Sequence, residues 1–257
     1  MSSDDLVIQP DLSVCIVVRT KNSSLAACLE GLANTAGPVD LEVIVADLSG
    51  QDQTALLASF PEIKHYEMDS HEAPSRALNR ALQLAGGRYL SVWEPEAIPQ
   101  RGCLENLINF LDETPDVGLA GPAVVDGYGR LESTARRFPC LSSLFSCQTP
   151  AGGSGPFREI DWLCSGVHII RRELLEEIGY FDERFDLPFQ EADYYLRAKR
   201  TGWHNFYLLQ SKVVHARPGR YRAGLQGSVQ ALAWVRSVLW WLCKKWLTKP
   251  GYYDPMG

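Results

Sequence analysis

The sequence predicts an α/β fold with a doubly wound, mostly parallel sheet, helices on both faces and an additional C-terminal helix. Three observations predict this fold. Apolar runs rich in β-branched residues occur at 12–18 and 41–47, as in strands that are buried on both faces. Amphipathic segments with helical spacing alternate with the apolar runs. The connections suit right-handed strand–helix–strand units, which place successive strands parallel in one sheet.

The first half of the chain repeats this unit. The strand LSVCIVV (12–18) is followed by a polar turn and by a helical pattern whose apolar face carries Leu25, Cys28, Leu29 and Leu32. The other elements expected in this half are strands at 41–47, 63–68, 88–93 and 117–125 and helices near 52–59, 74–85 and 101–113.

The second half has a different composition. Residues 126–158 are rich in Gly, Ser and Pro without a clear period, so we expect a long loop that closes over a bound ligand. The elements expected after this loop are strands at 160–171 and 204–209, a helix at about 189–201 between them, and a last ordered stretch at 212–219.

We divide the chain into one domain at 1–225 and a C-terminal helix and tail at 226–257. Residues 228–247 contain four tryptophans among apolar residues, but Arg236 and a pair of lysines interrupt the run. The run is therefore shorter than the ~18 apolar residues expected of a membrane-spanning helix. Such an amphipathic helix packs on its own domain, packs on a second subunit in a homodimer, or lies on a membrane surface. The sequence leaves these alternatives open.

Composition and missing motifs exclude several classes of protein. The 257 residues include 25 basic and 31 acidic side chains, and a net charge of -6 argues against nucleic acid as a partner. The start of the chain lacks the pattern of a secretory signal, and seven cysteines without a CxxC pair indicate reduced core residues of a cytosolic protein. No P-loop, no GxGxxG after a strand and no GxSxG elbow is present. His168, inside an apolar strand, is expected to be a core histidine with its hydrogen bonds satisfied.

Polar residues follow the predicted strands at their carboxyl ends, where open parallel sheets bind ligands. Thr20 and Asn22 follow the first strand, and Asp47 ends the second. Glu94 and Glu96, two residues apart after the strand RYLSVW, can lean toward one site and share a divalent cation. Oxygen ligands of this kind suit Mg²⁺ or Mn²⁺ bridging to phosphates. The alternative for each carboxylate is a solvated cap or turn residue.

The helix expected from about residue 189 begins with polar and acidic residues. Gln190, Glu191 and Asp193 cluster at its start, where the partial positive charge of a helix N-terminus favours carboxylates. This turn is expected to aim Glu191 into the site, while Asp193 and Arg197, four residues apart, pair along the helix. Ordinary capping acids are the alternative interpretation of this cluster.

Taken together, these segments resemble family 2 glycosyltransferases of the GT-A fold, and especially their rhamnosyltransferase-like branch. The family's first strand, T-x-N turn and following helix are similar to LSVCIVVRTKNSSLAACLEGL, and its V-D-N-x-S-x-D-G-[ST] motif is similar to EVIVADLSGQDQT. Its S-R-A-R-N-x-G segment resembles SRALNRAL, and its strand ending in L-N-P-D-[AT] resembles GGRYLSVWEPEAIP. Later motifs of that branch resemble GPAVVDGYGRLESTARRFP and DWLCSGVHIIRRELLEEIGYFDERFDLPFQEADYYLRAKRTGW. The match covers roughly residues 12–217.

The resemblance implies a set of site residues. The nucleotide-sugar site would contain Thr20, Asn22, Asp47, Arg76, Asn79, Glu94 and Trp162. The cation, Mg²⁺ or Mn²⁺, would bind Glu96 and His215, with Glu94 as an additional ligand. Glu191 would be the catalytic general base. Trp162 and Trp93 are each expected to pack on a sugar face or to belong to the core.

Four residues depart from the family pattern. Glu94 and Glu96 occupy the positions of the family's Asn and metal-binding Asp. When the E-D-x-D motif is aligned on Asp193, Gln190 falls at its Glu and Glu191 at its catalytic Asp. Each Asp-to-Glu change keeps the charge and lengthens the side chain by one methylene, and a 1 Å misplacement can cost on the order of 100-fold in rate.

The expected function is that of an inverting, metal-dependent hexosyltransferase of polysaccharide biosynthesis. It would move a sugar from a nucleotide-diphosphate sugar to a glycan or lipid-linked acceptor, in the cytoplasm at the inner face of the membrane. The departures motivate an alternative, a catalytically impaired relative that binds nucleotide sugar or glycan, or that serves as an assembly subunit. A nucleotidyltransferase of similar sheet topology fits Glu94-x-Glu96 but not the region 190–193.

Overall fold

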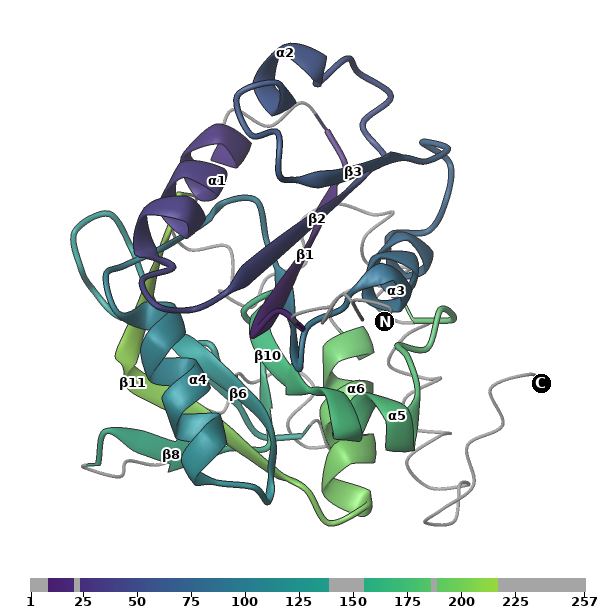
Figure 1. The fold of residues 1–257 in the computed structure, drawn as a ribbon. Helices are drawn as coiled ribbons and strands as arrows, with labels where there is room; N and C mark the ends of the chain where they lie inside the picture. Colours follow the sequence, from purple (N-terminus) through teal and green to yellow (C-terminus); the bar gives the residue numbers. More distant parts are fainter. Residues whose placement is uncertain (1–8, 21–23, 139–154, 186–188, 217–257) are drawn as a thin grey trace, which may run out of the picture.

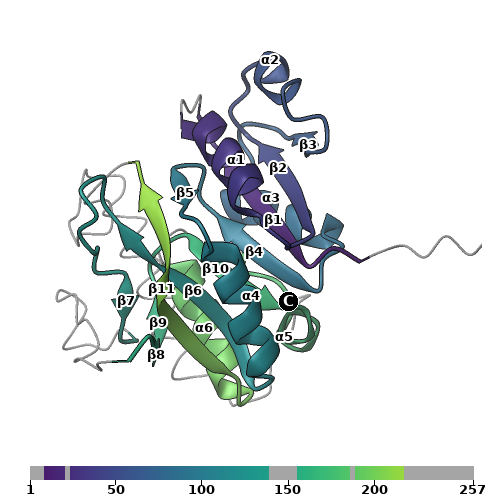
Figure 2. The same ribbon diagram turned by 60° about the vertical axis from the view of Figure 1, so that its left-hand side comes forward.

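The computed structural model describes residues 9–20, 24–138, 155–185 and 189–216. In these ranges one large mixed sheet is flanked by helices on both faces (Figure 1; Figure 2). The predicted α/β architecture is therefore confirmed. The segment 226–257, expected to form a C-terminal helix and tail, lies outside the described residues.

The elements of the first half alternate as the sequence predicts. The strands are β1 (Leu12–Val18), β2 (Leu41–Asp47), β3 (Lys64–Glu67), β4 (Tyr89–Trp93), β5 (Ala97–Pro99) and β6 (Val117–Val125). The helices are α1 (Ser24–Thr35), α2 (Thr54–Leu57), α3 (Pro74–Leu84) and α4 (Cys103–Glu113). Only the short strand β5 was not expected, because three residues are too few to show a period.

The second half adds four short strands, one long strand and two helices among the described residues. Its strands are β7 (Ala135–Arg136), β8 (Phe157–Glu159), β9 (Trp162–Leu163), β10 (Val167–Arg171) and β11 (His204–His215), and its helices are α5 (Arg172–Ile178) and α6 (Phe189–Arg200). The expected strand at 160–171 is thus two strands separated by a turn, and helix α5 was not expected. β11 joins the stretches predicted at 204–209 and 212–219 through a register shift after Leu208.

The main sheet has the strand order β3-β2-β1-β4-β10-β6-β11-β5, and β8 pairs with β11 beside this path. Strands β3, β2, β1 and β4 are parallel, as right-handed crossovers require. β10 is antiparallel to both β4 and β6, whereas β11 is parallel to β6. The mostly parallel sheet therefore contains one inserted antiparallel strand near its centre, and this strand brings the second half of the chain beside β4.

Two apolar layers cover the sheet. Helices α1 and α4 pack on one face, and α3, α5 and α6 pack on the other (Figure 1; Figure 2). In α1, Leu25, Cys28, Leu29 and Leu32 are buried, so the predicted apolar face is confirmed. The inner strands β1, β4, β6 and β10 are buried on both sides because each face of the sheet has its own helices.

The prediction of a long loop at 126–158 is partly wrong. β7 pairs with β9 in a separate two-stranded sheet, and β8 pairs antiparallel with β11. Strands of two or three residues depend on distant partners for their hydrogen bonds, so no local pattern indicates them. Residues 139–154 lie outside the described residues, and the expected closure over a ligand falls largely on them.

Four cysteines lie among the described residues, and all are free thiols. Cys15, Cys28 and Cys103 are buried, whereas Cys164 is partly exposed. Burial raises the pKa of the Cys103 thiol to about 12, which keeps it protonated and unreactive at neutral pH. The expected role as core residues is confirmed for Cys15, Cys28 and Cys103. Within the described ranges, none of the helices combines the length and hydropathy that crossing a bilayer requires.

Candidate active site

The predicted site residues lie at the carboxyl edge of the parallel strands. The registers pair Val18 of β1 with Asp47 of β2, and Ile16 of β1 with Trp93 of β4. Asp47 and the residues that follow Trp93 therefore meet at one edge of the sheet, as expected for a ligand site in an open α/β fold.

The segment that carries Glu94 and Glu96 is a tight turn between β4 and β5. The backbone N–H of Ala97 donates to the carbonyl of Glu94 at 3.0 Å. The Trp93 indole N–H donates to the carbonyl of Ala97 at 2.8 Å and fastens the turn to the core. Trp93 is only 1% exposed, so it is a core residue rather than a sugar platform.

Glu94, Glu96 and His215 form a cluster whose ligand atoms all lie within 4.8 Å of one another. His215 Nε2 is 3.1 Å from Glu94 Oε2, although the two residues are 121 positions apart. The pairing of β11 with β5 sets His215 opposite Ala97, and the N–H of Ala216 donates to the Glu96 carbonyl at 2.9 Å. Two carboxylates and one imidazole are a suitable ligand set for a divalent cation.

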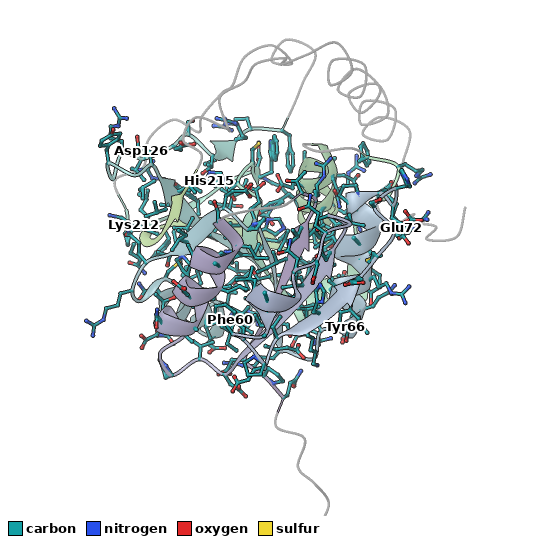
Figure 3. All side chains as sticks on the ribbon, turned by 90° about the horizontal axis from the view of Figure 1, so that it is seen from above. Phe60, Tyr66, Glu72, Asp126, Lys212 and His215 are labelled. Atoms are coloured by element: carbon teal, nitrogen blue, oxygen red, sulfur yellow. The ribbon has the colours of Figure 1, made fainter. Side chains whose placement is uncertain are left out.

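The position of His215 follows from the strand β11. Val214 is paired with Val125 of β6, so His215 and Asp126 come at the same end of two neighbouring strands (Figure 3). The side chain of His215 is fully buried, and Glu96 is 5% exposed. Burial of this cluster lowers the competition from water for a bound cation.

Glu191 lies in the first turn of α6 and is 6% exposed. Its Oε1 accepts a hydrogen bond from the backbone N–H of Gly166 at 3.1 Å. Gly166 also contacts Glu94, because a Cβ built on this glycine would lie 2.3 Å from Glu94 Cδ. The structure thus brings the predicted base and the predicted cation ligands together around one turn.

Asp47 presents one carboxylate oxygen to the sheet edge. Its Oδ1 accepts a hydrogen bond from the N–H of Ser49 at 2.7 Å, which fixes the side chain in an Asx turn. Its Oδ2 is buried and has no hydrogen-bond partner among the described residues, and His65 Nε2 lies 3.5 Å away. Sequence reasoning missed His65, although its place on the strand beside Asp47 was the available signal.

Thr20 follows β1 and is exposed, so it is accessible to a ligand at this edge. Asn22 lies outside the described residues. The expected roles of Thr20 and Asn22 in the nucleotide-sugar site therefore stay predictions.

Arg76 and Asn79 of α3 face the segment between α5 and α6. Arg76 Nε is 3.3 Å from Glu183 Oε2, and both side chains are exposed. The Asn79 amide donates to the Phe181 carbonyl at 2.9 Å and to Glu183 Oε1 at 3.1 Å. Asn79 therefore holds this segment in place, a role that the sequence did not indicate.

The structure also places one tryptophan and one histidine that the sequence singled out, Trp162 and His168. Trp162 is 6% exposed, packs in the core and donates from its indole N–H to the carbonyl of Arg137 at 2.9 Å. We therefore place it in the core, and its expected part in the nucleotide-sugar site stays a prediction. His168 is fully buried, but neither ring nitrogen has a hydrogen-bond partner among the described residues, so the expectation of a satisfied histidine was wrong.

Asp193, the second acidic residue of α6, has a structural role. Asp193 and Arg197 form the predicted pair, with Arg197 Nε 3.0 Å from Asp193 Oδ2, and both side chains are buried. Arg197 also donates to the carbonyls of Ile178 and Tyr180, which close the end of α5. The pair anchors α6 and so holds Glu191 at the sheet edge.

A twisted α/β sheet with acidic residues and a histidine gathered beyond its carboxyl edge is the architecture of GT-A glycosyltransferases, and solved structures of that class are similar. GalNAc-T7 with UDP, GalNAc and Mn²⁺ superposes with a TM-score of 0.67 at 15% identity, covering 91% of this chain and 48% of that one. TarS of S. aureus superposes with a TM-score of 0.60 at 17% identity, covering 92% and 72%. These similarities show the fold.

The sequence comparison assigns the family. The model of glycosyl transferase family 2 matches residues 13–179, and the chain belongs to this family. It is 24% identical over 203 residues to N-acetylglucosaminyl-diphospho-decaprenol L-rhamnosyltransferase of Mycobacterium tuberculosis, covering 68% of this chain and 66% of that protein. It is also 26% identical over 145 residues to cellulose synthase 2 of Novacetimonas hansenii, covering 55% of this chain and 9% of that protein. The chain thus spans just under two thirds of the rhamnosyltransferase and a small part of the synthase.

Proposed function

We propose that this chain is an inverting glycosyltransferase of polysaccharide biosynthesis. It moves a sugar from a nucleotide-diphosphate sugar to a hydroxyl of a glycan or lipid-linked acceptor at the cytoplasmic face of the membrane. The observation that carries the proposal is the gathering of Glu94, Glu96 and His215 within 4.8 Å at the sheet edge, with Glu191 joined to them through Gly166. The name of the mycobacterial relative, which includes a lipid-linked diphosphate sugar, supports the acceptor class.

Asp47 and Thr20 are proposed to bind the nucleotide. Within the described part of the chain, Asp47 Oδ2 is a buried acceptor without a hydrogen-bond partner. Oδ1 is held by the N–H of Ser49, so the carboxylate is oriented before a ligand arrives. Such an acceptor suits an N–H of a base or an O–H of a ribose. Arg76, which is exposed beside the same edge, supplies a positive charge toward the phosphates.

Glu94, Glu96 and His215 are proposed to hold Mg²⁺ or Mn²⁺. The hydrogen bond between His215 Nε2 and Glu94 Oε2 keeps the ring and the carboxylate in mutual reach, and burial fixes their rotamers. When bound, the cation stabilises the negative charge that develops on the departing diphosphate.

Glu191 is proposed as the general base. The Gly166 N–H holds one of its oxygens, and the start of α6 stabilises its charged form. Glu191 takes the proton of the acceptor hydroxyl while that oxygen forms a bond to the anomeric carbon. The bond from the anomeric carbon to the diphosphate breaks on the opposite side, and its electron pair leaves with the diphosphate. Attack in line therefore inverts the configuration.

The test compares the wild type with Glu191→Gln in two measurements, donor binding and sugar transfer. Calorimetry with UDP-, GDP- and dTDP-sugars, with and without Mn²⁺, identifies the donor for the wild type. The variant is expected to bind this donor with nearly unchanged affinity and to lose transfer by at least about 100-fold, since a general base contributes 10²–10⁴-fold. Glu113→Gln, an exposed residue at the end of α4, is the matched control. Unchanged transfer by Glu191→Gln would remove this residue as the base.

The same experiment separates the alternatives. Metal-dependent donor binding without any turnover by the wild type would favour a non-catalytic protein that binds nucleotide sugar, which the glutamates in place of aspartates motivate. Release of a sugar 1-phosphate instead of a nucleoside diphosphate would show that the nucleotidyl group, and not the sugar, is transferred, and would indicate a nucleotidyltransferase. Failure of every donor to bind a folded protein would overturn the proposed function.

A further inference from the structure

Gly166 lies between the two carboxylates to which the proposed function gives different roles. It belongs to the turn between β9 and β10, and its φ of +57° is in the left-handed region that favours glycine. The antiparallel register of β10 with β4 pairs Val167 with Trp93. The residue before Val167 therefore lies opposite the residue after Trp93, and Gly166 faces Glu94.

The missing side chain of Gly166 leaves the space that Glu94 occupies. A Cβ at this position would lie 2.3 Å from Cδ, 2.4 Å from Cγ and 2.5 Å from Oε1 of Glu94. These distances are far below van der Waals contact, so one of the two groups must move. Glu94 is the flexible partner, and a methyl group at 166 would displace its carboxylate from His215, which it now meets at 3.1 Å.

The backbone of Gly166 acts on the other carboxylate. Its N–H donates to Glu191 Oε1 at 3.1 Å. Alanine keeps this N–H but adds the methyl group, so substitution acts on Glu94 through contact and leaves the donor to Glu191 in place.

We propose that Gly166 is a positioning residue that sets the spacing between the cation-binding carboxylate of Glu94 and the general base Glu191. Its lack of a side chain admits Glu94, and its N–H holds Glu191, so one backbone position fixes both groups. This inference rests on the proposed function. It also accounts for a glutamate at position 94, because the turn at 166 accommodates the full length of that side chain.

The test is a double-mutant cycle with Gly166→Ala and Glu94→Ala. Gly202→Ala is the control for backbone strain, because Gly202 also has a positive φ of +97° but a Cβ there would meet nothing within 4 Å. The first readout is Mn²⁺ affinity by calorimetry in the absence of any sugar nucleotide. Gly166→Ala is expected to weaken Mn²⁺ binding by roughly tenfold or more, as for other residues that orient metal ligands, whereas Gly202→Ala leaves it unchanged.

The second readout is the thermal midpoint Tm of the same proteins in chelator. Gly166→Ala is expected to lower Tm more than Gly202→Ala does. In the Glu94→Ala background the contact is gone, so Gly166→Ala should lower Tm no more than Gly202→Ala does and should not weaken Mn²⁺ binding further.

The outcomes are distinguishable. If the wild type binds Mn²⁺ and Gly166→Ala binds it equally well, the positioning role is overturned while the cation site stands. The positioning role is also overturned if Gly166→Ala lowers Mn²⁺ affinity or Tm equally in the wild type and in Glu94→Ala, because the effect would then not depend on Glu94. If the folded wild type does not bind Mn²⁺, the cation site of the proposed function fails, and the positioning role fails with it.

Discussion

Asn79 and Phe181 exchange two hydrogen bonds across the face of the sheet that carries α3 and α6. Asn79 Oδ1 accepts from the Phe181 N–H at 3.0 Å, and Asn79 Nδ2 donates to the Phe181 carbonyl at 2.9 Å. The Phe181 ring stacks on Tyr194 of α6, with ring centroids 4.2 Å apart. This exchange ties α3 to the segment that leads into the helix of Glu191.

Asn79→Asp is therefore expected to destabilise the fold. The carboxylate keeps the acceptor for the Phe181 N–H but loses the donor, and it meets the Phe181 carbonyl and the carboxylate of Glu183. The expected loss is about 2–3 kcal/mol in the free energy of unfolding, measured with urea, because a buried acceptor is left unpaired. Gln83→Ala, exposed on the same helix, is expected to change it by less than about 0.5 kcal/mol. A similar small change for Asn79→Asp would contradict a structural role of this amide.

Removing Arg197 tests the anchor of α6. Arg197→Met keeps much of the apolar stem but leaves the buried carboxylate of Asp193 without its partner and removes the donors to the carbonyls of Ile178 and Tyr180. The expected cost is about 3–5 kcal/mol in the free energy of unfolding. The matched control is Arg80→Met at an exposed position of α3. Equal stability of the two variants in urea would show that the buried pair contributes little.

His168 should make the stability of the protein depend on pH. Burial lowers the pKa of this histidine from its ordinary 6.5 to about 3. Between these two values the unfolded chain binds a proton that the folded protein does not, so stability falls as pH falls through this window, by at most about 1.4 kcal/mol per pH unit. Above pH 6.5 this histidine contributes no pH dependence.

His168→Leu is expected to remove this part of the acid sensitivity. At neutral pH the variant should be about as stable as the wild type, because it replaces two buried ring nitrogens for which the described residues offer no hydrogen-bond partner. Urea unfolding at about pH 7.5 and about pH 4.5 checks this, and the stability gain of the variant should appear at the lower pH. Parallel pH dependence of variant and wild type would be evidence that His168 does not remain neutral.

Added Mn²⁺ should raise the Tm of the wild type. At a concentration about 100 times Kd, one bound ion stabilises the folded state by about 2.7 kcal/mol. His215→Ala is expected to lose most of this shift, since the cluster of Glu94, Glu96 and His215 loses its imidazole. His71→Ala, at an exposed histidine, is expected to keep the shift. An undiminished shift in His215→Ala would place the ion elsewhere.

Much of the sheet and one part of the site could be predicted from the sequence, because both depend on local patterns. The runs at 12–18 and 41–47 are mostly apolar since their strands lie inside the sheet with helices on both faces. Parallel strands place Asp47 and Glu94 at the same edge wherever their partners lie. The pair Asp193 and Arg197 follows from helical spacing alone.

The sequence by itself thus determined the α/β class, the parallel strands and the carboxylates at their ends, since hydrophobic period and strand direction are local properties. Only the tertiary structure decided that Glu94 meets His215 across 121 positions and that Gly166 lies against Glu94. It also placed Trp162 in the core and left the ring nitrogens of His168 without hydrogen-bond partners among the described residues. These contacts depend on the register of β10 against β4 and of β11 against β5, and register is set by the packing of the whole sheet.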